Sequence, residues 1–297
     1  MLTPLFVVAR IVTNPLSNLF QKRLTQRLAN PVFIIGVVHA LLTVMSLPLL
    51  WYLAPLKPGT GSEVWGNMAI CACLAVSGNV LLVYALKSTD LSVLGPINAY
   101  KSVVSLVLGI FLIGELPTTM GVAGILLILA GSYFIVDRDL AEPRTNAFVL
   151  FFRERGVQLR FAALGFSATE AVFLKKVILL TSPLTTFVLW SILGLPVASA
   201  AILIMLKGHV RHDIRIVQAN WRTYCWLAIT TGLMQLTTVL TFGTLQVGYS
   251  LALFQMSTLL SVFLGHRYFQ ERHIRKRLFG SMVMVAGAVM IVVFGGR

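Results

Sequence analysis

Charged and amide side chains occur inside long apolar runs of this sequence, where a bilayer would leave them without water. Lys101 lies near the middle of the run 91–113, and Asn98 shares its helical face one turn earlier. Glu170 is the only acidic residue at the centre of such a run, 159–180. Charged groups at this depth are costly and usually face a cavity or a partner. Lys101 therefore predicts an anchor for a carboxylate or phosphate.

Each of these two charges also has a structural interpretation. Lys101 could form a buried ion pair that only holds helices together, or its ammonium could reach water along a tilted helix. Glu170 could bind an amine, relay protons, or neutralise Lys101 or Arg10. The sequence does not decide between these roles.

Further polar residues follow helical spacing in the other apolar runs. Arg10, Asn14 and Asn18 do so around Pro15, a residue that can kink a helix. Their alternative role is hydrogen bonding between helices, worth about 0.6 kcal/mol on average in membranes. Arg10 is also close enough to the end of its run to reach headgroups. The full set of candidate substrate-binding residues is Lys101, Asn98, Glu170, Asn14, Asn18, Arg10, Asn79, Tyr84, Gln235, Gln255 and Ser257.

The composition indicates which solvent surrounds these residues. Hydrophobic residues make up 57% of the 297-residue chain and charged residues only 11%, whereas soluble domains carry roughly 25% charged residues. A soluble enzyme, a disordered chain and a disulfide scaffold are therefore excluded. The net charge of +14 comes from clusters between apolar runs, which is typical of membrane-flanking segments rather than of nucleic-acid binding. The three cysteines have no metal-site spacing.

Ten apolar runs approach the length of a membrane-spanning helix, which predicts an all-α polytopic membrane protein. They are approximately 3–21, 31–53, 67–86, 91–113, 118–136, 159–180, 184–206, 223–243, 247–269 and 278–295. The longest connection carries charges of both signs. It predicts a linker, 141–158, between a first five-helix unit, 1–140, and a second, 159–297.

The two units are related by an internal repeat. Shifting the chain by 156 residues aligns 94–137 with 250–293 at nine identical positions, among them Glu115 with Glu271. The same shift aligns Asn79 with Gln235, and Lys101 with Ser257. A unit with an odd number of spans must insert its second copy upside down. Inverted repeats of this kind are a recurrent design of secondary transporters, with the site near the midplane between the halves.

These residues resemble the paired EamA repeats of the drug/metabolite transporter superfamily, and the resemblance covers nearly the whole chain. One departure is Gln270, which precedes Glu271 where the first half has Gly114. The resemblance implies a ten-helix carrier for small metabolites, often an exporter, without a cofactor. The matching positions are Asn18, Lys22, Arg23, Pro31, Tyr84 to Lys87, Leu91, Ser92, Gly95, Pro96, Gly114, Glu115, Gly124, Gly131, Glu271, Gly280 and Gly287.

The repeated glutamates and glycines have structural interpretations. Glu115 and Glu271 are predicted at helix ends on opposite membrane faces, about 30 Å apart, so they cannot share one substrate. Each precedes the last helix of its unit, 118–136 or 278–295, and is predicted to cap free backbone donors there. The glycines at 124, 131, 280 and 287 are seven residues apart within each run, which predicts close helix packing.

The distribution of positive charge predicts an orientation. Eighteen of the 24 Lys and Arg fall in the loops after the first, third, fifth, seventh and ninth runs. The positive-inside rule places those loops in the cytoplasm and both termini outside. The usual arrangement in the resembled superfamily is the reverse. The predicted location is the bacterial inner membrane.

We therefore expect a secondary transporter that exports a small polar metabolite of the amino acid or organic acid class by alternating access. The expected partners are the substrate, the bilayer and protons as a candidate coupling ion, but no nucleic acid, and the carrier is a monomer or homodimer. The alternative is a polytopic membrane enzyme acting on a lipid-linked substrate, which would need an acidic metal-binding cluster. Aspartate occurs only at 90, 137, 139 and 213, and the sequence predicts neither catalytic residues nor a metal site. A channel is a third option, but no filter-like loop is present.

Overall fold

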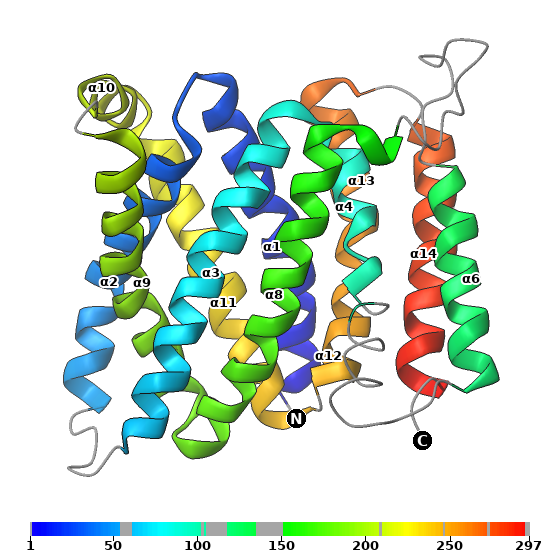
Figure 1. The fold of residues 1–297 in the computed structure, drawn as a ribbon, viewed down its shortest axis with the longest axis horizontal. Helices are drawn as coiled ribbons and strands as arrows, with labels where there is room; N and C mark the ends of the chain where they lie inside the picture. Colours follow the sequence, from blue (N-terminus) through cyan, green and yellow to red (C-terminus); the bar gives the residue numbers. More distant parts are fainter. Residues whose placement is uncertain are drawn as a thin grey trace.

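The computed structural model describes residues 2–53, 61–101, 104, 118–134, 151–207, 210–245, 247–271 and 274–294. These residues form helices and connections only, as the composition predicts, and the helices stand roughly side by side (Figure 1). The described helices are α1 (Thr3–Gln26), α2 (Pro31–Leu53), α3 (Ser62–Ser88), α4 (Leu91–Ile97), α6 (Thr119–Tyr133), α8 (Arg155–Leu180), α9 (Pro183–Leu206), α10 (Arg211–Ala219), α11 (Trp221–Thr244), α12 (Val247–Phe254), α13 (Ser257–Phe269) and α14 (Ile274–Phe294).

Four of the described helices are long and apolar enough to cross a membrane by length and composition: α2, α3, α9 and α11. A shorter apolar helix covers Thr119–Gly131. The helices α1 and α8 have similar lengths but are less apolar, because each carries charged side chains along it. The predicted total of ten spans therefore stays a prediction.

The most extensive helix contacts each join the first part of the chain to the second. They are the pairs α3–α8, α6–α14, α1–α11, α2–α9 and α4–α13. Under the 156-residue shift, α1 corresponds to α8 and α3 to α11, so the α1–α11 contact maps onto the α8–α3 contact. The α6–α14 and α2–α9 pairs map onto themselves. Reciprocal contacts of this kind are what a twofold axis produces, and they agree with the internal repeat.

Two helices related by the 156-residue shift are interrupted at positions that differ by one residue, where continuous helices were predicted. The run 247–269 divides into α12 and α13 at Gln255 and Met256. In the first half, α4 ends at Ile97, and Asn98 and Ala99 form a turn before helical backbone resumes at Tyr100. Pro96, the penultimate residue of α4, lacks a backbone donor. By contrast, α1 continues from Thr3 to Gln26 through Pro15.

The predicted glycine packing is confirmed where α6 meets α14. A Cβ atom on Gly131 would lie 2.7 Å from the carbonyl oxygen of Gly280, and one on Gly287 would lie 2.6 Å from that of Gly124. Backbone atoms cannot yield to such contacts as a flexible side chain can. The bare glycine surfaces therefore allow these two helices to approach closely.

Glu271 does cap a helix, but not the one that the sequence predicts. Its carboxylate accepts hydrogen bonds from the backbone nitrogens of Leu91 (2.9 Å) and Ser92 (2.8 Å), at the start of α4. The prediction of a cap on the following helix, α14, was wrong because α13 packs against α4 and ends beside its first turn. The equivalent residue, Glu115, lies outside the described residues.

The Glu271 carboxylate also belongs to a charge network between the halves, in which Lys22, Glu271 and Arg277 are buried and Asp90 is half-exposed. Lys22 Nζ lies 2.8 Å from Glu271 Oε1, and Arg277 Nη1 lies 2.9 Å from Asp90 Oδ2. Burial alone would raise the pKa of Glu271, but the Lys22 ammonium and the hydrogen bonds from Ser92 outweigh it and lower the pKa below the ordinary value. The network thus fastens α1 and α4 to the end of α13 and to α14.

Gln270, which precedes Glu271, is the position where the second half departs from the sequence of the first. Gln270 has a φ of 54°, in the left-handed region that glycine adopts without cost. The backbone turns there at the end of α13 and directs Glu271 towards α4. Gly114 is the repeat counterpart of Gln270, so the first half has glycine where this turn would favour it.

Replacement of Gly287 by alanine tests the α6–α14 contact. Gly287→Ala should lower the melting temperature of the purified protein, because overpacking costs about 1–3 kcal/mol. The matched control is Gly165→Ala in α8, where a Cβ would meet nothing within 4 Å and the helix should gain slightly. Equal melting temperatures for the two variants would contradict the packing.

The Glu271→Gln variant tests the charge network. At pH 7 it should be less stable than wild type by about 3–5 kcal/mol, since Lys22 stays buried without its partner. Because folding lowers the pKa of Glu271, the stabilisation is fully present above the unfolded value near 4.5 and is lost as pH falls through the folded value. Thermal unfolding in detergent from pH 7 down to 4 should therefore show the difference shrinking at the acidic end. The exposed Glu63→Gln should match wild type throughout, and an equal effect of both substitutions would speak against the network.

Candidate functional site

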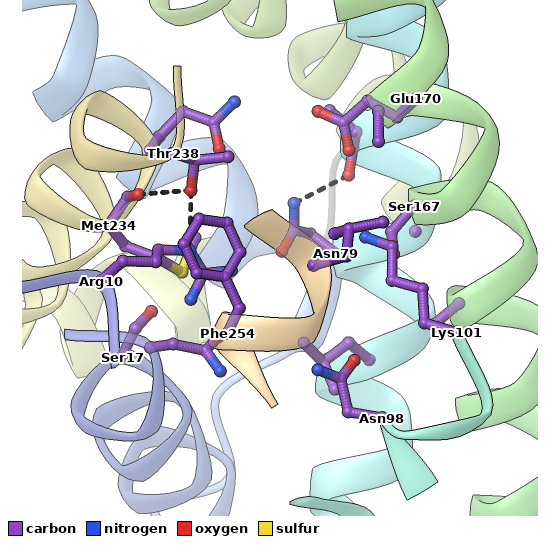
Figure 2. A pocket seen from close by; sticks show the side chains of 18 of the residues that line it. Arg10, Ser17, Asn79, Asn98, Lys101, Ser167, Glu170, Met234, Thr238 and Phe254 are labelled. Carbon is purple, nitrogen blue, oxygen red and sulfur yellow. Dashed lines mark hydrogen bonds between the residues drawn. The ribbon is translucent and has the colours of Figure 1, made fainter. Parts of the chain in front are cut away.

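A cavity of about 120 Å³ lies between the two halves of the chain. Its wall combines side chains from α1, α3, α8, α9, α11 and α12 with Asn98 and Lys101 beyond the end of α4. Figure 2 shows Arg10 on one side of it, and Lys101 with Glu170 on the other. The polar lining consists of Arg10, Asn14, Ser17, Asn18, Gln21, Asn79, Asn98, Lys101, Arg160, Ser167, Glu170, Gln235, Thr238 and Gln255, and Trp190 contributes its indole N–H.

The Arg10 side chain lies in the cavity wall, where two contacts hold it. Its Nε donates to Thr238 Oγ1 at 2.7 Å, and its guanidinium carbon lies 4.9 Å from the centre of the Phe254 ring. The Nη1 atom is buried and has no hydrogen-bond partner. The two contacts hold Arg10 against α11 and the end of α12, and they argue against a headgroup role.

Lys101 and Glu170 line the cavity together without forming a direct ion pair. Among the described residues, no carboxylate lies within 4.0 Å of the Lys101 ammonium. Glu170 instead accepts a hydrogen bond from Trp190 Nε1 at 3.0 Å. The static pair that the sequence left open is absent from this part of the chain, so both charged groups remain directed at the cavity.

Arg160 is a cavity residue that the sequence did not reveal. It was counted with the positive charges of a connecting loop, but it lies inside α8 and its side chain is buried. Its Nε donates to the carbonyl oxygen of Leu94 at 3.1 Å, and its Nη2 to Asn98 Oδ1 at 2.9 Å. Helical spacing could have identified it, because residues 160, 163, 167 and 170 share one face of α8 and all line the cavity.

The hydrogen bond from Arg160 satisfies a backbone carbonyl that the helix break leaves without its usual donor. In a continuous helix the Leu94 carbonyl would accept from the nitrogen of Asn98, but that nitrogen bonds to Gly95 instead. A freed carbonyl without water needs another donor. The guanidinium of Arg160 supplies it and positions the Asn98 side chain at the same time.

Several amides of the wall are paired across the halves. Asn98 Nδ2 lies 3.4 Å from Gln255 Oε1, and Asn14 Nδ2 donates to Ser257 Oγ at 3.2 Å. Three buried amide atoms of the lining have no partner: Gln21 Oε1, Gln235 Nε2 and Gln255 Nε2. The interhelical hydrogen bonds that were the alternative interpretation therefore satisfy only part of this polar lining.

Nine of the eleven candidate residues line the cavity. Ser257 lies behind the wall, buried and bonded to Asn14. Tyr84 packs against the apolar core instead, because five residues of helix turn it about 140° away from Asn79. Trp190 was also missed, since a buried tryptophan resembles any other core residue until its N–H has an acceptor.

Residues 5–137 match the EamA-like transporter family. The EamA resemblance is confirmed over that range. A solved crystal structure of a protein is similar over 98% of this chain and 96% of its own, with a TM-score of 0.66. The identity is 15%, so this likeness concerns the fold alone. No protein with a curated function matches the sequence.

The EamA match and the apolar helices identify an integral membrane protein and indicate a membrane transporter. The second half lies outside the range matched to the EamA family. Within the described ranges, no group of three or more His, Cys, Asp or Glu side chains could hold a metal ion.

Proposed function

We propose that this protein is a secondary transporter that exports a small polar metabolite by alternating access between two inverted five-helix repeats, 1–140 and 159–297, joined by the linker 141–158. The observation that carries the proposal is the polar cavity between the halves, to which both contribute charged or amide side chains. Its volume of about 120 Å³ is well below the roughly 300–1,000 Å³ of drug-sized sites, which favours a small solute.

Two further features support the alternating-access mechanism. The reciprocal helix pairs are those expected of inverted repeats. The interrupted helices meet at the cavity, where Asn98 lies within one break and Gln255 within the other. Discontinuous helices at the substrate site are a common design of secondary transporters.

The charge of the lining favours an organic acid or an amino acid. Arg10 and Lys101 can each bind a carboxylate, and Glu170 offers an acceptor for an amino group. Export is the direction that the EamA resemblance implies. Glu170 is the proposed proton carrier, because it is the only acid among the described lining residues.

The proposed location is the inner membrane, with both termini outside. The start of α1 and the end of α14 lie at the same face (Figure 1). The α10 helix lies at the opposite face (Figure 1) and carries Arg211 and Arg215. The number of loop cations that supports this orientation falls by one, because Arg160 lies in the cavity.

Release from proteoliposomes tests the transport function. Vesicles containing the purified protein and loaded with amino acids, organic acids, amines, sugars and nucleosides should release one polar class selectively, as measured by mass spectrometry. Lys101→Met should abolish this release, whereas Lys176→Met, an exposed cation on α8, should not. Glu170→Gln should remove any dependence on a pH gradient. No release above protein-free vesicles would contradict the transport function.

Reporter fusions test the orientation. A fusion after Arg297 should be active with alkaline phosphatase, which needs the periplasm, and inactive with a cytoplasmic reporter such as green fluorescent protein. A fusion after Arg215 should give the reverse pattern. Fluorescence from the fusion after Arg297 would place the termini inside.

A further inference from the structure

The described lining of the cavity carries a surplus of positive charge. Arg10, Lys101 and Arg160 are cationic, and Glu170 is the only acid among them. The formal surplus is two charges. Inside a membrane protein such a surplus is costly unless a counter-ion enters. A substrate with two negative charges would neutralise it.

The cations are divided between two sides of the cavity. Arg10 lies on α1 and is held by Thr238 on α11 and Phe254 at the end of α12. Arg160, on α8, bonds to Asn98 three residues before Lys101. In Figure 2, Arg10 and Thr238 lie on one side, and Lys101 and Asn98 on the other. Two anionic groups of one solute could each bind one of these sides.

Each side also has a buried donor without a partner. On the first side these are Arg10 Nη1 and Gln235 Nε2, and Gln235 lies one turn before the Thr238 that holds Arg10. On the second side it is Gln255 Nε2, whose Oε1 already faces Asn98. Unpaired buried donors are unfavourable. The oxygens of a carboxylate can accept from a guanidinium and an amide at once.

We propose that the cavity binds a small dicarboxylate, with one carboxylate at Arg10 and Gln235 and the other at Lys101, Arg160 and Gln255. The inference rests on the proposed transport function and specifies its substrate class. Arg160 is the specificity-determining residue on the second side, because it adds a fixed charge next to Lys101. Ser257 is aligned with Lys101 by the internal repeat, but its hydroxyl is uncharged, so the other half does not provide a cation at this position.

Counterflow measures this preference without a variant. Proteoliposomes are loaded with unlabelled compound, and uptake of radiolabelled succinate is followed. Internal succinate or malate should drive uptake, whereas butyrate, with one charge, glutamine, a zwitterion, and putrescine, a dication, should not. Glycerol 3-phosphate, whose two charges occupy one group, should drive it at least tenfold less well.

Single substitutions test which residues bind the substrate on each side of the cavity. Arg10→Met, Lys101→Met and Arg160→Met should each raise the half-saturating succinate concentration by about ten- to a hundredfold, as expected for lost hydrogen bonds to charged groups. Lys101→Arg should retain most of the affinity, and Lys176→Met should match wild type. Size-exclusion profiles identify variants that fail to fold. If Arg160→Met fails, Arg160→Lys, which keeps the charge, should fold and retain measurable counterflow.

The outcomes separate this inference from the proposed function. Selective succinate counterflow that Lys101→Met weakens supports both. Release of another class from the mixed pool, with no uptake of labelled succinate by vesicles that contain succinate or malate, would overturn the dicarboxylate inference and leave a transporter. If no compound in the panel, nor any from the mixed pool used for release, supports flux by folded protein, both fail.

Discussion

A helix that breaks inside a membrane exposes backbone groups that no water reaches, and the cavity depends on how these groups are satisfied. Arg160 donates to the freed carbonyl of Leu94 after α4 is interrupted. Arg10 packs over Phe254, the last residue of α12. Each half therefore provides an arginine, on α1 or α8, that contacts the interrupted helix of the other half. The same contacts that stabilise the breaks bring positive charge to the cavity.

The repeat explains the framework but not the chemistry. Helices pair reciprocally, and Asn79 and Gln235 occupy equivalent positions in the wall. The halves differ at another aligned pair, Lys101 and Ser257. Lys101 faces the cavity, whereas Ser257 lies behind the cavity wall and bonds to Asn14. A symmetric framework with asymmetric charge gives a solute one defined orientation, which an exact twofold site would not.

Much of the site could be predicted because a bilayer penalises buried charge, and that penalty is visible in sequence. Lys101, Glu170 and Asn98 were found in this way. Arg160 was missed because a cation one or two turns inside a helix is indistinguishable from a membrane-flanking charge. The break at Gln255 was missed because no proline or glycine marks it. The partners of Glu271 could not be found either, since they depend on how the halves pack.

The cap on α4 has a consequence for how the chain is made. The carboxylate that binds Lys22 and the first turn of α4 is synthesised long after both, because Glu271 lies 249 residues after Lys22 and 180 after Leu91. Until Glu271 is made, Lys22 lacks this carboxylate, and the backbone nitrogens of Leu91 and Ser92 lack their acceptor. The first half of the chain thus cannot complete its final packing as an independent unit during synthesis. The halves must mature together, and a truncated chain would present these unpaired groups to membrane quality-control proteases.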